Sequence, residues 1–251
     1  ALELRYRHVD TAQAYGNERQ VGTAIRSSGV DRDDLFLTTK LDGGSRRSEA
    51  VHRSVRESLD RLHTDYLDLL LIHWPNDRPP FVPVRLPGGV PLAETLTAMN
   101  ELVEEGVVRH VGVSNFDVRL LDEARRLSDA PIFADQVQFH PYWDQRRLRS
   151  YCRRNDVLLT AYSPLCHGGV LDDEVLRDVG RRYGKTTAQV AIRWAIQHEG
   201  VCTIPKATSR EHLTANVDVF DFELTEAEME RIRRPSRLRT FAGFARSRLP
   251  V

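Results

Sequence analysis

The chain has 251 residues, 41% hydrophobic and 29% charged, a composition typical of a globular domain and unlike that of a disordered chain. Lysine plus arginine equals aspartate plus glutamate at 36 each, so no net charge favours binding to nucleic acid or an acidic membrane. Three cysteines without a C-x-x-C pair disfavour a disulfide framework or structural zinc. No signal peptide or membrane-spanning run is recognisable, and we expect a soluble cytoplasmic protein.

Seven short apolar runs, rich in Leu, Val and Ile, alternate with amphipathic stretches along the chain. Such runs are typical of strands that are buried on both faces of a parallel sheet. The predicted strands are, in chain order, 6–10, 35–40, 66–73, 108–114, 133–138, 157–162 and 202–206.

Capping residues indicate where the helices between these strands begin and end. The main signals are Ser48 at a helix start, Gly106 after a helix end, Asp117 as a cap, and two capping boxes, Thr186 with Gln189 and Thr225 with Glu228. No repeat or linker divides the chain, so residues 1–251 are predicted to form one domain.

Strand–helix alternation over this length predicts either an eight-stranded (β/α) barrel or an open doubly wound sheet. The open sheet requires a Gly-rich phosphate turn, and no G-x-G-x-x-G occurs. Residues 1–4 are typical of the last turn of a helix, and only seven strands are found. We therefore expect an α/β fold, a (β/α)8 TIM barrel without its first strand. Because two sheet edges would then be exposed, we expect low stability or weak activity unless another element fills the gap.

Polar or ionisable side chains follow every predicted strand. They are Asp10, Lys40, His73 with Trp74, Ser114 with Asn115, Gln136, Tyr162 with Ser163, and Lys206. In (β/α) barrels the active site lies at the C-terminal ends of the strands, so these side chains are expected to converge on one site.

Four residues in this region suit proton donation to a carbonyl oxygen. Tyr15 is a weak acid, with an ordinary pKa of about 10, and an adjacent Lys40 ammonium is expected to lower it. Asp10 would keep Lys40 charged, and His73 could hold a substrate oxygen. Each residue alone has an ordinary structural role, such as capping or core packing, but their joint occurrence at consecutive strand ends favours a catalytic set.

The blocks of sequence around these residues resemble the aldo-keto reductase family. The blocks are Y-R-H-V-D-T-A at 6–12, Y-G-N-E at 15–18, T-T-K at 38–40, H-W-P at 73–75, G-V-S-N-F at 112–116, Q-V-Q-F-H-P at 136–141, A-Y-S-P-L at 161–165 and I-P-K at 204–206. The resemblance runs from residue 1 to about residue 234 and is closest to prokaryotic members similar to diketogluconate reductases. The family's first strand and N-terminal hairpin have no counterpart in this sequence.

The resemblance implies NADPH-dependent reduction of aldehyde or ketone groups of small molecules. Members of the family are often monomers, and we expect a monomer here. Tyr15 would be the proton donor, Asp10 and Lys40 would tune it, and His73 and Trp74 would contact the substrate. The residues expected to bind the cofactor are Ser114, Asn115, Gln136, Tyr162, Ser163, Leu165, Lys206, Thr208, Arg210, His212 and Asn216.

The segment after the last strand favours NADPH over NADH. Lys206 precedes a helix predicted to begin near Ser209, and a helix N-terminus with Lys206 and Arg210 nearby is a plausible phosphate site. In the family this segment binds the adenosine 2′-phosphate. Ala207 and His212 stand where the family often has Ser and Arg, and neutral imidazole is a weaker phosphate ligand. NADH is therefore kept as an alternative cofactor.

Two other functions compete with carbonyl reduction. A metal-dependent hydrolase could use the residues His8, Asp10, His73, His110 and His140, but no metal-binding motif is present and we expect no metal. A catalytically weak or non-catalytic NADP-binding barrel is the second alternative. The complete set of four catalytic residues argues against it, and the absence of a first strand argues for it.

Overall fold

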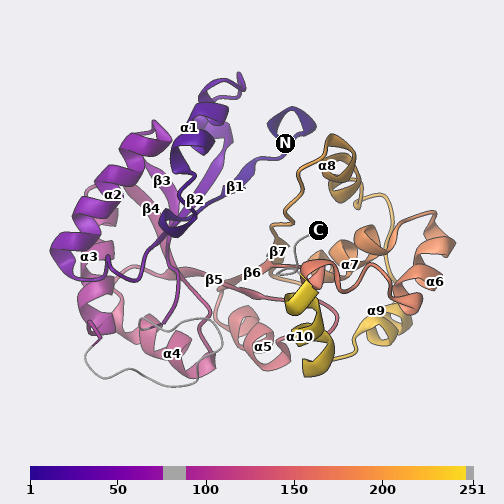
Figure 1. Cartoon of the computed structure of the whole chain (residues 1–251). Helices are drawn as coiled ribbons and strands as arrows, with labels where there is room; N and C mark the ends of the chain where they lie inside the picture. The colour runs from indigo at the N-terminus through magenta and orange to yellow at the C-terminus, as the bar shows by residue number, and fades with distance from the viewer. Residues whose placement is uncertain (76–88, 247–251) are drawn as a thin grey trace. The chain divides into compact units, whose positions relative to one another are not determined.

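The computed structural model describes residues 1–75 and 89–246, in which parallel strands alternate with helices as predicted (Figure 1). The chain divides into two compact units. Residues 2–135 form an N-terminal unit, and residues 136–251, together with Ala1, form a C-terminal unit. That 1–251 make up a single domain stays a prediction. The sequence pattern also predicts one long loop at Pro79–Pro91, and most of it lies outside the described residues.

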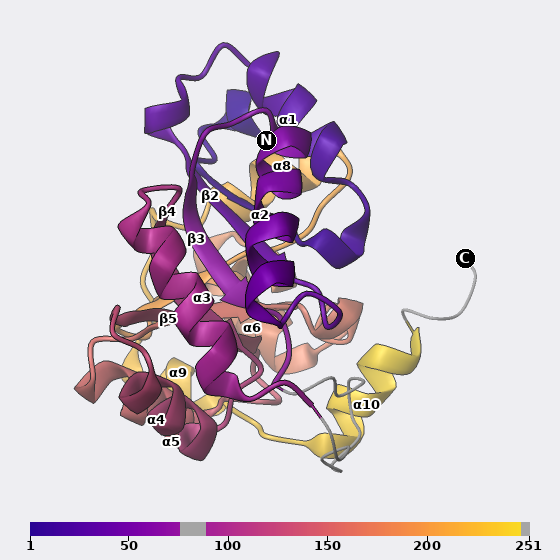
Figure 2. The same ribbon diagram turned by 90° about the vertical axis from the view of Figure 1, so that its left-hand side faces the viewer.

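The N-terminal unit is built on parallel strands that pair in chain order. The strands are β1 (His8–Asp10), β2 (Phe36–Leu41), β3 (Leu67–Ile72), β4 (Val108–Ser114) and the beginning of β5 (Ile132–Gln138). The helices are α1 (Glu18–Arg26), α2 (Ser48–Leu62), α3 (Leu92–Glu104) and α4 (Val118–Leu127), with 3₁₀ turns η1 (Leu2–Leu4), η2 (Gln13–Tyr15) and η3 (Arg32–Asp34). Helix α2 packs between α1 and α3, and Figure 2 shows α2 and α3 side by side.

The centre of this unit is β3, which is buried along its whole length. Its one charged residue, Asp68, accepts a hydrogen bond from the backbone N of Leu37 at 2.9 Å and pairs with Arg32 and Arg109 at 2.8 and 3.0 Å. The two guanidinium groups lie over the ring of Tyr66, 3.9 and 4.0 Å from its centroid. The buried carboxylate is therefore fully compensated, which fixes the N-terminal ends of β2, β3 and β4 relative to one another.

Gly22 allows α1 to approach the C-terminal end of α2. A Cβ at this position would lie 2.5 Å from the carbonyl carbon and oxygen of Leu62. Alanine ordinarily stabilises a helix relative to glycine by about 1 kcal/mol. We expect Gly22→Ala to destabilise the protein instead, by about 1–3 kcal/mol, because the backbone of Leu62 cannot move away. Urea unfolding measures the change, with Thr23→Ala on the exposed side of α1 as control; a stabilised Gly22→Ala protein would contradict the expectation.

The C-terminal unit contains the end of β5 and two further strands, β6 (Leu158–Tyr162) and β7 (Val201–Thr203), which pair in parallel. Its helices are α5 (Arg146–Arg154), α6 (Glu174–Tyr183), α7 (Thr187–Ile196), α8 (Arg210–Val217), α9 (Glu226–Ile232) and α10 (Arg237–Arg246), with the 3₁₀ turn η4 (Cys166–Gly168). Trp194 of α7 is fully buried, stacks on Phe139 at 5.1 Å, and donates its Nε1–H to the carbonyl of Met229 at 3.1 Å. This aromatic pair forms the centre of the unit's core.

The predicted helix caps are confirmed. The Asp117 carboxylate accepts from the backbone N of Leu120 at 2.9 Å, and both capping boxes are formed. The last strand is shorter than predicted and ends at Thr203. The backbone N of Ile204 still donates to the carbonyl of Ala161, but Pro205 has no N–H with which to continue the ladder. No helix among the described residues combines the length and apolar character that crossing a membrane would require.

Candidate active site

The four predicted catalytic residues lie on adjacent elements of the N-terminal unit. Asp10 ends β1, Lys40 lies near the end of β2, and His73 directly follows β3. In the parallel register Asp10 is opposite Thr38, and Lys40 is opposite Leu71. Tyr15 is the last residue of the turn η2, which follows β1. The ends of β1, β2 and β3 therefore bring Asp10, Lys40 and His73 together, and that the polar residues after β5, β6 and β7 join them stays a prediction.

A buried ion pair is at the base of this group. The Nζ of Lys40 donates to the carboxylate of Asp10 and to the backbone carbonyl of Thr11, the latter at 2.8 Å. The side chain of Lys40 is 0% exposed and that of Asp10 is 8% exposed. Burial lowers the pKa of Lys40, and the adjacent Asp10 carboxylate opposes that shift. Asp10 and Lys40 thus form a buried pair, and that Asp10 keeps Lys40 charged stays a prediction.

The Tyr15 ring contacts both Lys40 and His73. Its centroid is 5.1 Å from the Nζ of Lys40 and 5.6 Å from the centroid of the His73 ring, which meets it edge-on at 82°. Tyr15 as a whole is 52% exposed, so a substrate can reach it. Burial, and secondarily the Asp10 carboxylate, raise the pKa of Tyr15 to about 12. The expected net lowering of this pKa by Lys40 is therefore wrong for this structure, because burial and the negative charge of Asp10 outweigh the attraction between the Lys40 ammonium and a phenolate.

His73 is a neutral imidazole near physiological pH. Burial, followed by the Lys40 ammonium, lowers its pKa to about 4. Its backbone carbonyl accepts a hydrogen bond of 3.0 Å from Nδ2 of Asn115, which also donates to Oγ of Ser114 at 3.0 Å. The Trp74 ring lies beside the imidazole, with centroids 6.3 Å apart. Two predicted cofactor residues and the predicted pocket residue thus adjoin the catalytic set.

The other predicted cofactor residues belong to the C-terminal unit. Gln136 is buried in β5, Tyr162 ends β6, and Ser163 has a left-handed φ of 49°. Leu165 caps η4, Lys206 and Thr208 lie in the loop after β7, and Arg210, His212 and Asn216 lie on α8. Ser209 caps α8 by accepting from the backbone N of His212 at 3.1 Å. The start of the predicted phosphate-binding helix is therefore confirmed, with Lys206 and Arg210 exposed beside it.

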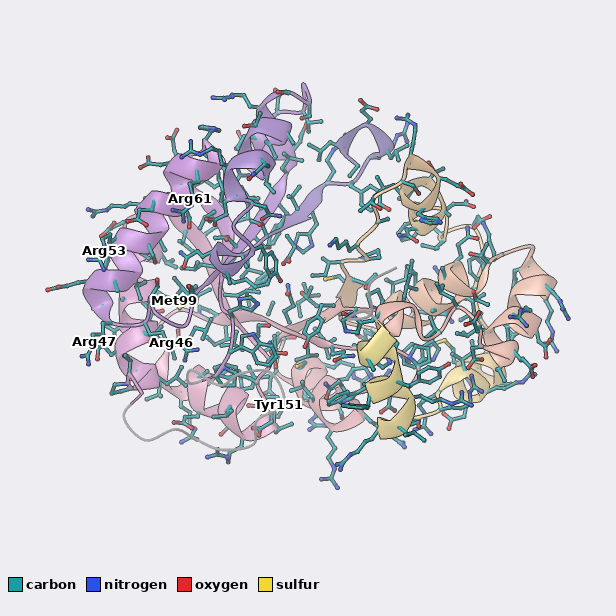
Figure 3. All side chains as sticks on the ribbon, in the orientation of Figure 1. Arg46, Arg47, Arg53, Arg61, Met99 and Tyr151 are labelled. Carbon is teal, nitrogen blue, oxygen red and sulfur yellow. The ribbon has the colours of Figure 1, made fainter. Side chains whose placement is uncertain are left out.

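One residue that sequence reasoning missed is Glu18, whose carboxylate binds Thr39, the neighbour of Lys40 on β2. Its buried carboxylate accepts from Thr39 Oγ1 at 2.7 Å, Arg61 Nε at 2.8 Å and Ser58 Oγ at 3.2 Å. Figure 3 labels Arg61 on α2. The signal was available, because Glu18 shares the buried face of α1 with Gly22 and Ile25, where an acidic residue requires partners.

His140, one of the proposed ligands of a metal-dependent hydrolase, has a structural environment in the C-terminal unit. Its Nδ1 accepts from the backbone N of Tyr142 at 3.2 Å, and its Nε2 is 3.0 Å from the side-chain amide of Gln138. Within the ranges 1–75 and 89–246, no three His, Cys, Asp or Glu side chains are grouped so that they could hold a metal ion.

Protonation of His140 is expected to destabilise the protein in acid. Burial lowers its pKa to about 3, whereas an unfolded histidine titrates near 6.5. The unfolded state therefore binds a proton that the folded state does not, and stability is lost as the pH falls from about 6.5 toward 3, by a total of roughly 3–5 kcal/mol. Urea unfolding between pH 7.5 and 4.5 measures the slope, which should be smaller for His140→Gln. The exposed His212→Gln is the control, and equal slopes in all three proteins would contradict the assignment.

The sequence matches the model of the Aldo/keto reductase family over residues 1–236. The chain belongs to this family. It is 40% identical over 232 residues to the glyoxal reductase of Bacillus subtilis (strain 168), with 92% of this chain and 79% of that protein aligned.

Solved structures of the family have the same fold. A "putative 2,5-diketo-D-gluconic acid reductase B" superposes with a TM-score of 0.87 at 46% identity, covering 92% of this chain and 79% of that chain. An aldo-keto reductase of Bombyx mori, solved in complex with NADP, superposes with a TM-score of 0.84 at 32% identity. The match covers 92% of this chain and 79% of that chain. The predicted fold class and the resemblance to diketogluconate reductases are confirmed.

Family membership also decides between the alternatives that the sequence left open. Aldo-keto reductases bind a nicotinamide cofactor, and the Bacillus subtilis relative is named for the reduction of glyoxal, a dicarbonyl compound. The chain is therefore an oxidoreductase that reduces carbonyl groups, rather than a metal-dependent hydrolase.

Proposed function

We propose that this aldo-keto reductase uses NADPH to reduce aldehydes and ketones of small molecules, with Tyr15 as the proton donor. The observation that carries the proposal is the fully buried ammonium of Lys40, paired with Asp10, beside an accessible phenol and a neutral His73. Polar groups in such a site act on a reacting carbonyl without the reorganisation that water would require.

Each of the four side chains has a separate role in proton transfer. When bound, NADPH supplies the hydride that the carbonyl carbon receives. The neutral imidazole of His73 donates a hydrogen bond to the carbonyl oxygen, and the Tyr15 hydroxyl transfers its proton to that oxygen. Lys40 stabilises the phenolate left on Tyr15, and Asp10 keeps Lys40 charged at the moment of transfer. A pKa of about 12 keeps Tyr15 protonated at neutral pH, as a proton donor must be.

The donor groups of the chain fit a dinucleotide phosphate. Ser114 and Asn115 present hydroxyl and amide groups next to His73, and these match the hydrogen bonds that a nicotinamide carboxamide makes. Lys206 and Arg210 flank the capped N-terminus of α8, where a phosphate would be favoured. We propose that the remaining cofactor contacts come from Gln136, Tyr162, Ser163, Leu165, Thr208, His212 and Asn216. The NADP bound by the Bombyx mori relative supports NADPH as the preferred cofactor.

The proposal is tested by following reduced-nicotinamide absorbance with purified protein. NADPH and NADH are each offered with glyoxal, an aromatic aldehyde and a keto acid, glyoxal because of the name of the Bacillus subtilis relative. We expect faster turnover with NADPH, and about tenfold weaker NADPH binding in Arg210→Ala with little change for NADH. The exposed Arg19→Ala is the matched control. Oxidation of neither cofactor with any carbonyl would overturn the proposal; cytoplasmic localisation and a monomeric state stay predictions.

A further inference from the structure

Gln13 makes three long-range hydrogen bonds from the turn that carries Tyr15. Its Nε2 donates to the backbone carbonyl of Ser54 at 3.2 Å and to Ser58 Oγ at 3.1 Å, both on α2. Its Oε1 accepts from the backbone N of Asp42 at 2.9 Å. The nitrogen and the oxygen of the side-chain amide are thus both hydrogen-bonded, to residues 29 to 45 positions away in the sequence.

The turn itself provides little to hold Tyr15 in place. Turn η2 is three residues long and has no side-chain cap. It is closed by backbone bonds, including Tyr15 N to Ala12 O at 3.0 Å and Gly16 N to Gln13 O at 3.2 Å, and its flanking residues are joined by a hydrogen bond from Thr11 Oγ1 to Asn17 Oδ1 at 2.7 Å. Tyr15 is half exposed, so its contacts with Lys40 and His73 hold only part of the ring. The position of the phenol therefore depends on what tethers the turn to the rest of the unit.

The same amide also connects Tyr15 to Lys40. Asp42 is the second residue after Lys40 and directly follows β2. Two residues before Gln13, the carbonyl of Thr11 accepts a hydrogen bond from Lys40 at 2.8 Å. The segment 11–13 is therefore linked to the Lys40 strand twice, at the ammonium itself and at Asp42 two residues later, and Gln13 provides the second link.

The anchor on α2 is rigid. Ser58 Oγ, which accepts from Gln13, donates to the buried Glu18 carboxylate at 3.2 Å and accepts from Arg61 at 3.1 Å. Glu18 in turn binds Thr39, the neighbour of Lys40, at 2.7 Å. Every hydrogen-bonding position of the serine hydroxyl is occupied, so Gln13 is tied to a network that has no freedom to shift.

We propose that Gln13 is a positioning residue for proton transfer, which sets the place of the Tyr15 phenol relative to Lys40. This inference rests on the proposed role of Tyr15. In the described part of the chain the side-chain hydrogen bonds of Gln13 go to Ser54, Ser58 and Asp42, none of which is assigned to the reaction or the cofactor, so its effect is exerted through Tyr15. Displacement of a reacting group by about 1 Å can lower a rate by about 100-fold.

The test replaces the amide by an apolar chain of similar length, Gln13→Met. We expect kcat to fall by about 10- to 100-fold, with the Kd for NADPH measured by fluorescence unchanged within about twofold. The solvent deuterium isotope effect on kcat should rise, because proton transfer is the step that is impaired. Gln13→Asn keeps the amide but is too short to reach both partners, and it should give an intermediate loss if Gln13→Met does not fold.

Gly180→Ala separates positioning from general destabilisation. A Cβ at Gly180 would lie 2.3 Å from the carbonyl of Lys185 in the C-terminal unit, so this variant loses stability without touching η2. An equal fall in kcat for Gly180→Ala and Gln13→Met at equal loss of Tm would overturn the proposal.

The double variant with Tyr15→Phe shows whether Gln13 acts through the phenol. If it does, Gln13→Met causes no further loss in the Tyr15→Phe background, whereas independent effects would multiply and would overturn the proposal. Retention of wild-type turnover by Tyr15→Phe would instead refute the proposed function itself. Full turnover by Gln13→Met, with an inactive Tyr15→Phe, would refute only the role of Gln13.

Discussion

The Tyr15→Phe variant is expected to reduce carbonyl substrates about 10²- to 10⁴-fold more slowly than the natural chain, with unchanged cofactor affinity. The substitution removes only the hydroxyl, so the ring can still meet His73 edge-on and cover Lys40. What is lost is the single proton donor placed beside a charged lysine. Single-turnover rates with saturating NADPH measure the effect on chemistry, and fluorescence titration measures binding of the cofactor.

Tyr142→Phe is the matched control for this variant. Tyr142 belongs to the C-terminal unit, where its hydroxyl donates to the Asp173 carboxylate. Its removal should cost stability and leave the single-turnover rate of the folded protein unchanged. A Tyr15→Phe protein that reduces carbonyls within about tenfold of the natural rate would show that the proton comes from elsewhere, with His73 as the first group to examine.

Much of the fold could be predicted from the sequence because its signals are local. Capping boxes at Thr186 and Thr225 act within one helical turn, and short apolar runs are sufficient to locate buried parallel strands. The placement of Asp10, Lys40 and His73 also follows from local pattern, since parallel strands end at a common edge. The early end of β7 depends on one missing N–H at Pro205, which the apolar pattern does not register.

The parts of the site that could not be predicted depend on contacts between distant segments. The three bonds of Gln13 join residues separated by 29 to 45 positions, and no spacing rule connects them. The predicted direction of the Tyr15 pKa shift was wrong for a related reason. Its direction is set by the competition between burial, Lys40 and Asp10, and sequence identifies the charges without their distances or their solvation.

Removing one partner of the Asp10–Lys40 pair is expected to cost more stability than removing both. Asp10→Asn leaves a fully buried ammonium that still donates to the Thr11 carbonyl, and Lys40→Met removes the ammonium from beside a carboxylate that is 8% exposed. Each single substitution should lower the free energy of unfolding by about 3–5 kcal/mol, because it leaves a buried charge without the opposite charge beside it. The double variant contains neither charge, and its loss should be smaller than that of either single variant.

The three variants therefore form a double-mutant cycle that separates stability from catalysis. Urea unfolding gives the coupling energy, which should be favourable by several kcal/mol if the pair is as buried as the structure shows. Additive losses would contradict this, since they would mean that water reaches Lys40. Turnover should follow a different pattern, because the double variant recovers stability but has no ammonium to stabilise the Tyr15 phenolate. A stable double variant that also recovers turnover would show that the pair is structural and that Tyr15 needs no adjacent cation.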